Sequence, residues 1–126
     1  MKPEHKFYQE IKKSWTDIQF NRIENLSLPG IPDVLCYNKN NTFFTLELKV
    51  TNSNKIRLSP HQIAFHVKHP ENTFIIVKHL ASSDVKLYEG KDVQELAACG
   101  FKLEACCSGL AACRLLLAEL GRKETA

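Results

Sequence analysis

The chain has 126 residues, of which 44% are hydrophobic and 25% are charged, and its formal net charge is +3. This composition is ordinary for a soluble globular protein, and the length predicts one domain that buries a core without disulfides or a structural metal. The mild charge permits a polyanionic partner without requiring one. No apolar run follows the start MKPEHKFYQE, and the most apolar late segment, residues 109–120, is too short to span a bilayer. We therefore expect no signal peptide and a cytoplasmic protein.

The first part of the chain predicts a helix and then a strand. Phe7, Ile11 and Trp15 share one face at helical spacing, so residues 3 to about 16 are expected to be helical. Residues 17–24, with the sequence DIQFNRIE, alternate apolar and polar side chains, as a half-buried strand does.

A loop and two further strands follow. Residues 26–30 contain Pro29-Gly30 and predict a loop. Residues 31–37 and 42–50 are rich in aromatic and β-branched side chains, and an Asn-rich turn joins them into a predicted hairpin. The polar, basic residues 51–58 then form a connector.

The second half begins with the clearest helix. Ser59 is a preferred N-cap and Pro60 a preferred first helical residue, so a helix is expected from there to about Lys68. The apolar run NTFIIVKHL over residues 72–80 predicts a central strand covered on both faces. Further predictions are an edge strand at residues 85–88, a short helix at 92–99 and a final helix at 106–120. This order predicts an α/β domain with a mixed central sheet.

Five cysteines remain to be interpreted. They include no CxxC pair, and the adjacent Cys106 and Cys107 lack zinc-ligand spacing. We therefore expect buried or half-buried free thiols in a reducing compartment.

The predicted hairpin carries three charges in a stretch that otherwise favours burial. Residues two apart on a strand share a face, so Glu47 and Lys49 point the same way. If residues 39–41 close the turn, residue 38 pairs with 42, and Asp33 lies opposite Glu47. Like charges opposed across antiparallel strands are destabilising. The sequence therefore predicts either a neutralised carboxyl or a cation held between the two.

Two carboxylates, a neighbouring main-chain carbonyl and water are the oxygen ligands that Mg²⁺ prefers. Lys49 lies one step along the same face, where its ammonium can donate to a water or a phosphate oxygen. The chemistry that suits this arrangement is phosphodiester hydrolysis. Taken singly, Glu-x-Lys is usually a solvated strand face and Pro-Asp often only begins a strand. Their joint placement on one hairpin favours the site.

Asp33, followed by Glu47-Leu48-Lys49, resembles the PD-(D/E)xK nuclease motif, with Pro32 directly before the aspartate. Further features resemble the archaeal-type Holliday-junction resolvases and VRR-NUC domains: Glu10, Arg22, the loop of residues 27–30, and LSPHQIAFH at residues 58–66. The resemblance covers about residues 5–80. It implies a restriction-endonuclease-like α/β fold, with an α-β-β-β-α-β core and a mixed central sheet flanked by helices. A C-terminal helical extension would occupy about residues 91–121.

The resemblance also implies roles for individual residues. Asp33 and Glu47 would bind Mg²⁺, for which Mn²⁺ would substitute, with help from the carbonyl of Leu48. Lys49 would orient or activate the attacking water, and Glu10 would complete the metal shell through water. The alternative for Glu10 is a surface glutamate in a lysine-rich helix.

Gln62 has two readings. In the family, a glutamine early in this helix lies near the metal-bound water, but Ser59-x-x-Gln62 is also a capping box. His61 is either a helix-surface residue or a phosphate contact. The candidate DNA contacts, each of which could equally be an ordinary solvated polar group, are Lys12, Lys13, Arg22, Ser27, Lys55, Arg57 and His61.

These observations predict a Mg²⁺-dependent DNA endonuclease that selects branched DNA and acts as a resolvase-like homodimer. The expected pairing surface is the last helix, which is apolar on most of its circumference through Leu110, Leu115, Leu116, Leu117 and Leu120. Two alternatives stay open. One is a catalytically inactive nucleic-acid-binding protein on the same fold, and the other is a sequence-specific restriction-type endonuclease.

Overall fold

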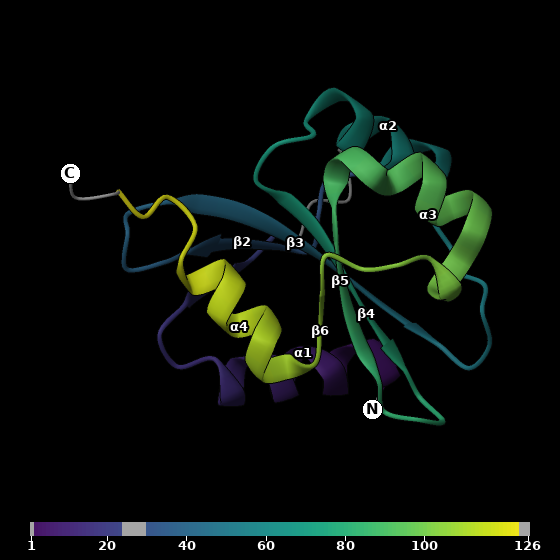
Figure 1. The fold of residues 1–126 in the computed structure, drawn as a ribbon, viewed down its shortest axis with the longest axis horizontal. Helices are drawn as coiled ribbons and strands as arrows, with labels where there is room; N and C mark the ends of the chain where they lie inside the picture. Colours follow the sequence, from purple (N-terminus) through teal and green to yellow (C-terminus); the bar gives the residue numbers. More distant parts are fainter. Residues whose placement is uncertain (1, 24–29, 124–126) are drawn as a thin grey trace.

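The computed structural model describes residues 2–23 and 30–123, which form a six-stranded mixed sheet with helices on both faces (Figure 1). The strands lie side by side in chain order: β1 (Gln19–Arg22), β2 (Val34–Tyr37), β3 (Phe43–Thr51), β4 (Thr73–His79), β5 (Val85–Glu89) and β6 (Cys107–Ser108). The helices are α1 (Pro3–Ser14), α2 (Pro60–Lys68), α3 (Val93–Cys99) and α4 (Leu110–Ala118). Adjacent strands are antiparallel except β3 and β4, which are parallel because α2 connects them. The predicted α/β class with a mixed sheet is confirmed.

The two faces of the sheet bury separate cores. Even-numbered residues of β3 and β4, such as Leu46 and Ile76, pack under α1 and α4 in the larger core. Odd-numbered residues of β4, such as Ile75 and Val77, pack with Leu96 of α3 in the smaller core. The run predicted as a central strand is therefore covered on both faces.

The predicted hairpin register is confirmed. Val34 pairs with Leu46 and Tyr37 with Phe43, so the position numbers in each pair sum to 80. Asn38 N–H donates to the Thr42 carbonyl at 3.2 Å, which closes the turn at the expected residues. The buried Asn38 amide also donates to the Leu117 carbonyl at 2.9 Å, so the turn is fixed to the end of α4.

Helix α2 begins and ends where the sequence predicts. Ser59 Oγ accepts from the Gln62 N–H at 3.1 Å, and Gln62 Oε1 accepts from the Ser59 N–H at 2.9 Å. This reciprocal capping box fixes the first turn of the helix, and Pro60 supplies a pre-set first residue. Helix α1 also matches its prediction, ending two residues early at Ser14.

The C-terminal region differs from the predicted helical extension. Residues 106–109 are not helical, and Cys107–Ser108 forms β6 beside β5. Gly109 has a φ of 89°, outside the helical region, so α4 starts only at Leu110. The strand predicted at residues 85–88 is present as β5, but its predicted place at the edge of the sheet is wrong, because β6 pairs outside it.

The leucines of α4 are mostly used within the domain. Leu117 is buried, while Leu110, Leu116 and Leu120 pack against the larger core. Leu115 is the exception, with 57% of its surface exposed. The predicted apolar pairing surface is thus reduced to one exposed leucine among these five. No helix within residues 2–23 and 30–123 is long and apolar enough to cross a membrane. All five cysteines are free, and four of them are buried or half-buried as predicted, whereas Cys106 is exposed.

Candidate functional site

The odd-numbered residues of β3 carry the charges of the hairpin to the sheet face that α2 covers. Glu47 is 1% exposed, and Lys49 follows it on the same face. Asp33 lies just before β2, next in register to the Val34–Leu46 pair, so it comes opposite Glu47. Its Oδ2 accepts a hydrogen bond from the Leu48 N–H at 2.9 Å. The expected convergence of the two carboxyls and the lysine is present.

Gln62 connects these charged groups to α2. Its Nε2 donates to Glu47 Oε1 at 2.5 Å, and its Oε1 accepts from Lys49 Nζ at 3.1 Å. The same Oε1 is the acceptor of the capping box. The capping-box reading of Gln62 is confirmed, and the same side chain also contacts two of the predicted site residues. Its place beside a metal-bound water stays a prediction.

Glu47 is an unusual buried carboxyl. Its Oε2 is buried and receives no donor from the part of the chain that the structure describes. Burial and, next, the hydrogen bond to and the charge of the adjacent Asp33 carboxyl together raise the pKa of Glu47 from 4.5 to about 9, although the Lys49 charge opposes the rise. A buried carboxyl oxygen without a donor beside a second carboxylate is what a divalent cation would neutralise.

The donor set fits Mg²⁺ or Mn²⁺. Asp33 and Glu47 supply two carboxylates, and Mg²⁺ usually keeps several waters around one or two such groups. Among residues 2–23 and 30–123, no cluster of three or more His, Cys, Asp or Glu side chains suited to a metal occurs. A metal bound here would therefore be held by these two carboxylates, with water completing its shell.

The glutamate expected to complete the metal shell lies elsewhere. Glu10 Oε2 pairs with Lys78 Nζ at 3.0 Å. Lys78 is in register with Val50, whereas Lys49 is in register with Val77, so Lys78 and Glu10 lie on the opposite face of the sheet from Glu47. The structure does not bring Glu10 to the site.

Glu4, one turn before Phe7, is the acidic residue of α1 that faces the site. It lines a small hollow with Asp33 and a larger one with Lys49. Burial raises the pKa of Glu4; the neighbouring Lys49 charge lowers it and the Asp33 charge raises it. Sequence reasoning missed this residue, although Glu4 shares the helix face of Phe7 and Ile11 at i+3 and i+7.

Basic residues flank both ends of the site. In the small hollow Arg22 Nη1 and His5 Nδ1 lie 3.2 Å apart, and the Arg22 guanidinium is 5.5 Å from the centre of the Tyr8 ring. The larger hollow, of about 340 Å³, is lined by Lys55 and Arg57 in addition to Lys49. Of the predicted phosphate contacts, Arg22 thus lines the same hollow as Asp33, and Lys55 and Arg57 line the same hollow as Lys49.

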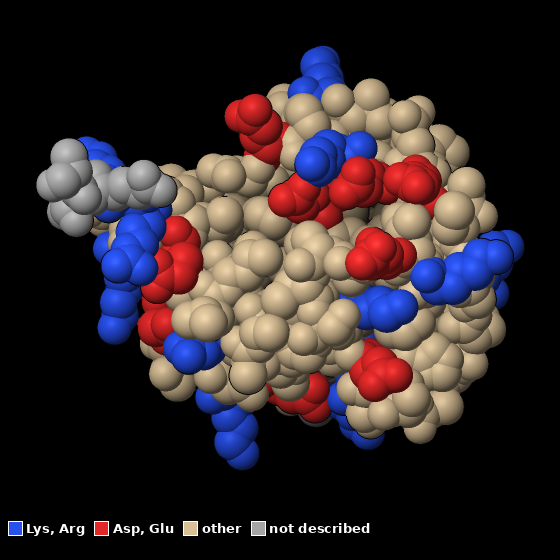
Figure 2. All heavy atoms as spheres, viewed as in Figure 1, with Lys and Arg blue, Asp and Glu red and all other residues tan. Residues whose placement is uncertain are grey.

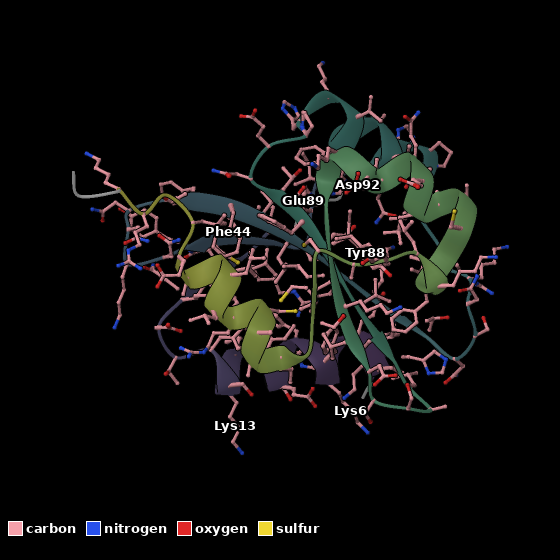
Figure 3. All side chains as sticks on the ribbon, in the orientation of Figure 1. Lys6, Lys13, Phe44, Tyr88, Glu89 and Asp92 are labelled. Atoms are coloured by element: carbon pink, nitrogen blue, oxygen red, sulfur yellow. The ribbon has the colours of Figure 1, made fainter. Side chains whose placement is uncertain are left out.

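The remaining predicted contacts lie apart from these hollows or cannot be placed. Lys12 Nζ lies 5.2 Å from the centre of the Tyr8 ring, and Lys13 extends from α1 away from the sheet (Figure 3). His61 is exposed on the first turn of α2. Ser27 and most of its predicted loop lie outside the described residues. On the face seen in Figure 2, acidic and basic side chains are interspersed.

Comparison with known proteins adds no family to this geometry. Neither a scan against protein-family models nor a search of curated proteins gives a match for the chain.

Proposed function

We propose that the protein is a metal-dependent DNA endonuclease with a restriction-endonuclease-like fold. The observation that carries the proposal is the buried Glu47 carboxyl, which converges with Asp33 and Lys49 on one sheet face and retains an oxygen without a donor. A purely structural strand would gain nothing from burying a carboxyl that must first take up a proton to lie beside a second one.

Each residue has a distinct task in the proposed hydrolysis. Asp33 and Glu47 hold Mg²⁺, which when bound supplies positive charge against the phosphate of the scissile bond. Lys49 has three N–H donors, one of which is directed to Gln62. Its ammonium can therefore also donate to the attacking water or to a phosphate oxygen, whose charge grows in the transition state. Gln62 holds both Lys49 and Glu47 in position.

The substrate is proposed to be branched DNA. The basic groups beside the site (Arg22, Lys55 and Arg57) suit contacts to phosphates, which fix position but do not read sequence. A chain of 14.3 kDa with one such site needs a second copy to make two matched cuts in a four-way junction, so a homodimer is part of the proposal.

The test is a panel of end-labelled duplex, flap, single-stranded and four-way-junction DNAs, incubated with Mg²⁺ or with EDTA. We expect cleavage that requires the metal and is absent in Asp33→Ala, with the junction or another branched DNA cleaved fastest. Metal-independent cleavage, or cleavage retained by Asp33→Ala, would contradict the proposal. Binding of the same DNAs without cleavage under every metal tested would favour the inactive binding protein.

A further inference from the structure

The sheet face that carries Asp33 and Glu47 continues into an open groove of aromatic side chains. The groove has a volume of about 290 Å³ and lies between the β2–β3 hairpin and the C-terminal end of α2. Its main side chains are Leu35, Phe43 and Thr45 from the hairpin and Phe65 and His69 from the α2 side.

The hairpin wall of this groove presents one exposed aromatic ring, that of Phe43, which packs against the half-buried Tyr37. Tyr37 and Phe43 are cross-strand partners with ring centres 4.4 Å apart, and 56% of the Phe43 surface is exposed. On the other wall, the Phe65 and His69 rings lie 4.9 Å apart. Thr45 Oγ1 is buried and has no hydrogen-bond partner among the described residues. The groove thus combines flat aromatic surfaces with an unused hydroxyl.

The groove lies in line with the proposed catalytic residues. Asp33, Leu35 and Tyr37 are alternate residues, so they share one face, as do Glu47, Thr45 and Phe43 on the neighbouring strand. The four residue-to-residue steps from Asp33 to Tyr37 cover roughly 13 Å at about 3.3 Å per step. That distance corresponds to about four stacked nucleotides of a DNA strand, or to fewer nucleotides if the DNA strand is unstacked. A strand whose phosphate reaches Asp33 can therefore place a nearby base on Phe43.

We infer that this groove holds an unpaired base of the DNA substrate, a few nucleotides from the scissile phosphate. The inference rests on the proposed function, because it names which DNA the same site accepts. Bases within a duplex have both faces covered by their neighbours, so an exposed aromatic ring selects a flipped or single-stranded base. The protein therefore prefers branched DNA with a single-stranded segment beside the cut.

The test uses binding, so that it does not depend on cleavage. Fluorescence anisotropy of a labelled oligothymidylate and of a matched duplex is measured in EDTA for the wild type, Phe43→Ala and Leu115→Ala. Leu115, which is 57% exposed on α4, is the matched control for loss of an exposed apolar side chain. We expect Phe43→Ala to weaken oligothymidylate binding about tenfold, with duplex binding and the control unchanged.

A second variant gives a direct signal. In Phe43→Trp combined with Trp15→Phe, the only tryptophan of the chain lies in the groove, because Trp15 is the only native one. We expect restored binding and quenching of this tryptophan by the oligothymidylate. Equal loss of single-strand and duplex binding in Phe43→Ala, or no loss, would overturn the inference. The inference would also be overturned if light scattering showed that DNA-free Phe43→Ala differs in mass from the DNA-free wild type, because the groove would then be an interface between two copies of the chain.

The outcomes separate this inference from the proposed function. Phe43-dependent oligothymidylate binding that persists without any cleavage would support the groove and contradict the nuclease. If the wild type and Phe43→Ala both cleaved DNA in a metal-dependent way, with the same preference for substrates that have a single-stranded segment, the nuclease function would be supported and the base-binding role of the groove would be contradicted.

Discussion

Strand β3 has one apolar face and one face with charged residues, and successive residues of the strand point to the two faces in turn. Leu46 and Leu48 point into the larger core, where they are 0% and 4% exposed and surrounded by apolar side chains. Glu47, between them, is equally buried on the other face, beside a second carboxyl and a lysine. The first face stabilises the domain, and the second accepts an electrostatic cost. This contrast supports the proposed metal-binding role of Glu47.

The largest expected effect is on cleavage. We expect Asp33→Ala and Glu47→Ala to remove metal-dependent cleavage, and Lys49→Ala to lower turnover by roughly 10²–10⁴-fold while DNA binding remains. Single-turnover rates and anisotropy measure the two properties separately. A Lys49→Ala protein that cleaves at the wild-type rate would make the lysine structural.

The next effect contrasts the two faces in stability. Leu46→Ala should lower the free energy of unfolding by about 2–5 kcal/mol, because it leaves a cavity in the larger core. In EDTA at neutral pH, Glu47→Gln should leave it unchanged or raise it, because glutamine, unlike Glu47, does not have to take up a proton when it is buried. Urea denaturation measures both variants. Equal destabilisation by the two would mean that Glu47 is a structural group.

The pH dependence of stability follows from the raised pKa of Glu47. The unfolded chain loses this proton near 4.5, whereas the folded protein keeps it up to about 9. The folded state therefore binds more protons between these values, and the free energy of unfolding should fall as pH rises, by at most about 1.4 kcal/mol per pH unit from this group. Urea denaturation in EDTA from pH 5 to 9 measures the slope, which should be shallower in Glu47→Gln. Identical slopes in the wild type and in Glu47→Gln would contradict the raised pKa of Glu47.

A smaller effect separates the two roles of Gln62. Gln62→Ala should cost about 1 kcal/mol of stability as a lost cap and also lower the cleavage rate, because Lys49 and Glu47 lose their shared partner. Ser59→Ala is the matched control, since it removes the cap alone. If both variants lower the melting temperature and neither lowers the rate, Gln62 is only a cap.

The smallest effect concerns the two glutamates of α1. Glu4→Gln should weaken Mg²⁺ binding a few-fold, because it removes a negative charge beside Asp33. Glu10→Gln should leave metal binding unchanged and cost at most about 1 kcal/mol, as loss of a part-exposed ion pair does. Metal titrations of the two variants make the comparison. If Glu10→Gln weakened metal binding more than Glu4→Gln did, Glu10 would complete the metal shell as the sequence predicted.

Local signals predicted the parts of this molecule that local chemistry determines. The capping box set the start of α2, and the Asn-rich turn with strand alternation set the register that brings Asp33 to Glu47. The two-residue strand Cys107–Ser108 could not be predicted, because it is too short to show a period and exists only through pairing with β5. Glu4 rather than Glu10 reaches the site because of how α1 docks on the sheet, which depends on the whole fold.

The central claim is that Asp33 and Glu47 together hold a divalent cation. Calorimetric titration of Mn²⁺ into the wild type, Glu47→Gln and Glu10→Gln tests it most directly. We predict one site in the wild type and in Glu10→Gln, and loss of that site in Glu47→Gln. Binding of equal strength in Glu47→Gln, or no binding in the wild type, would contradict the claim.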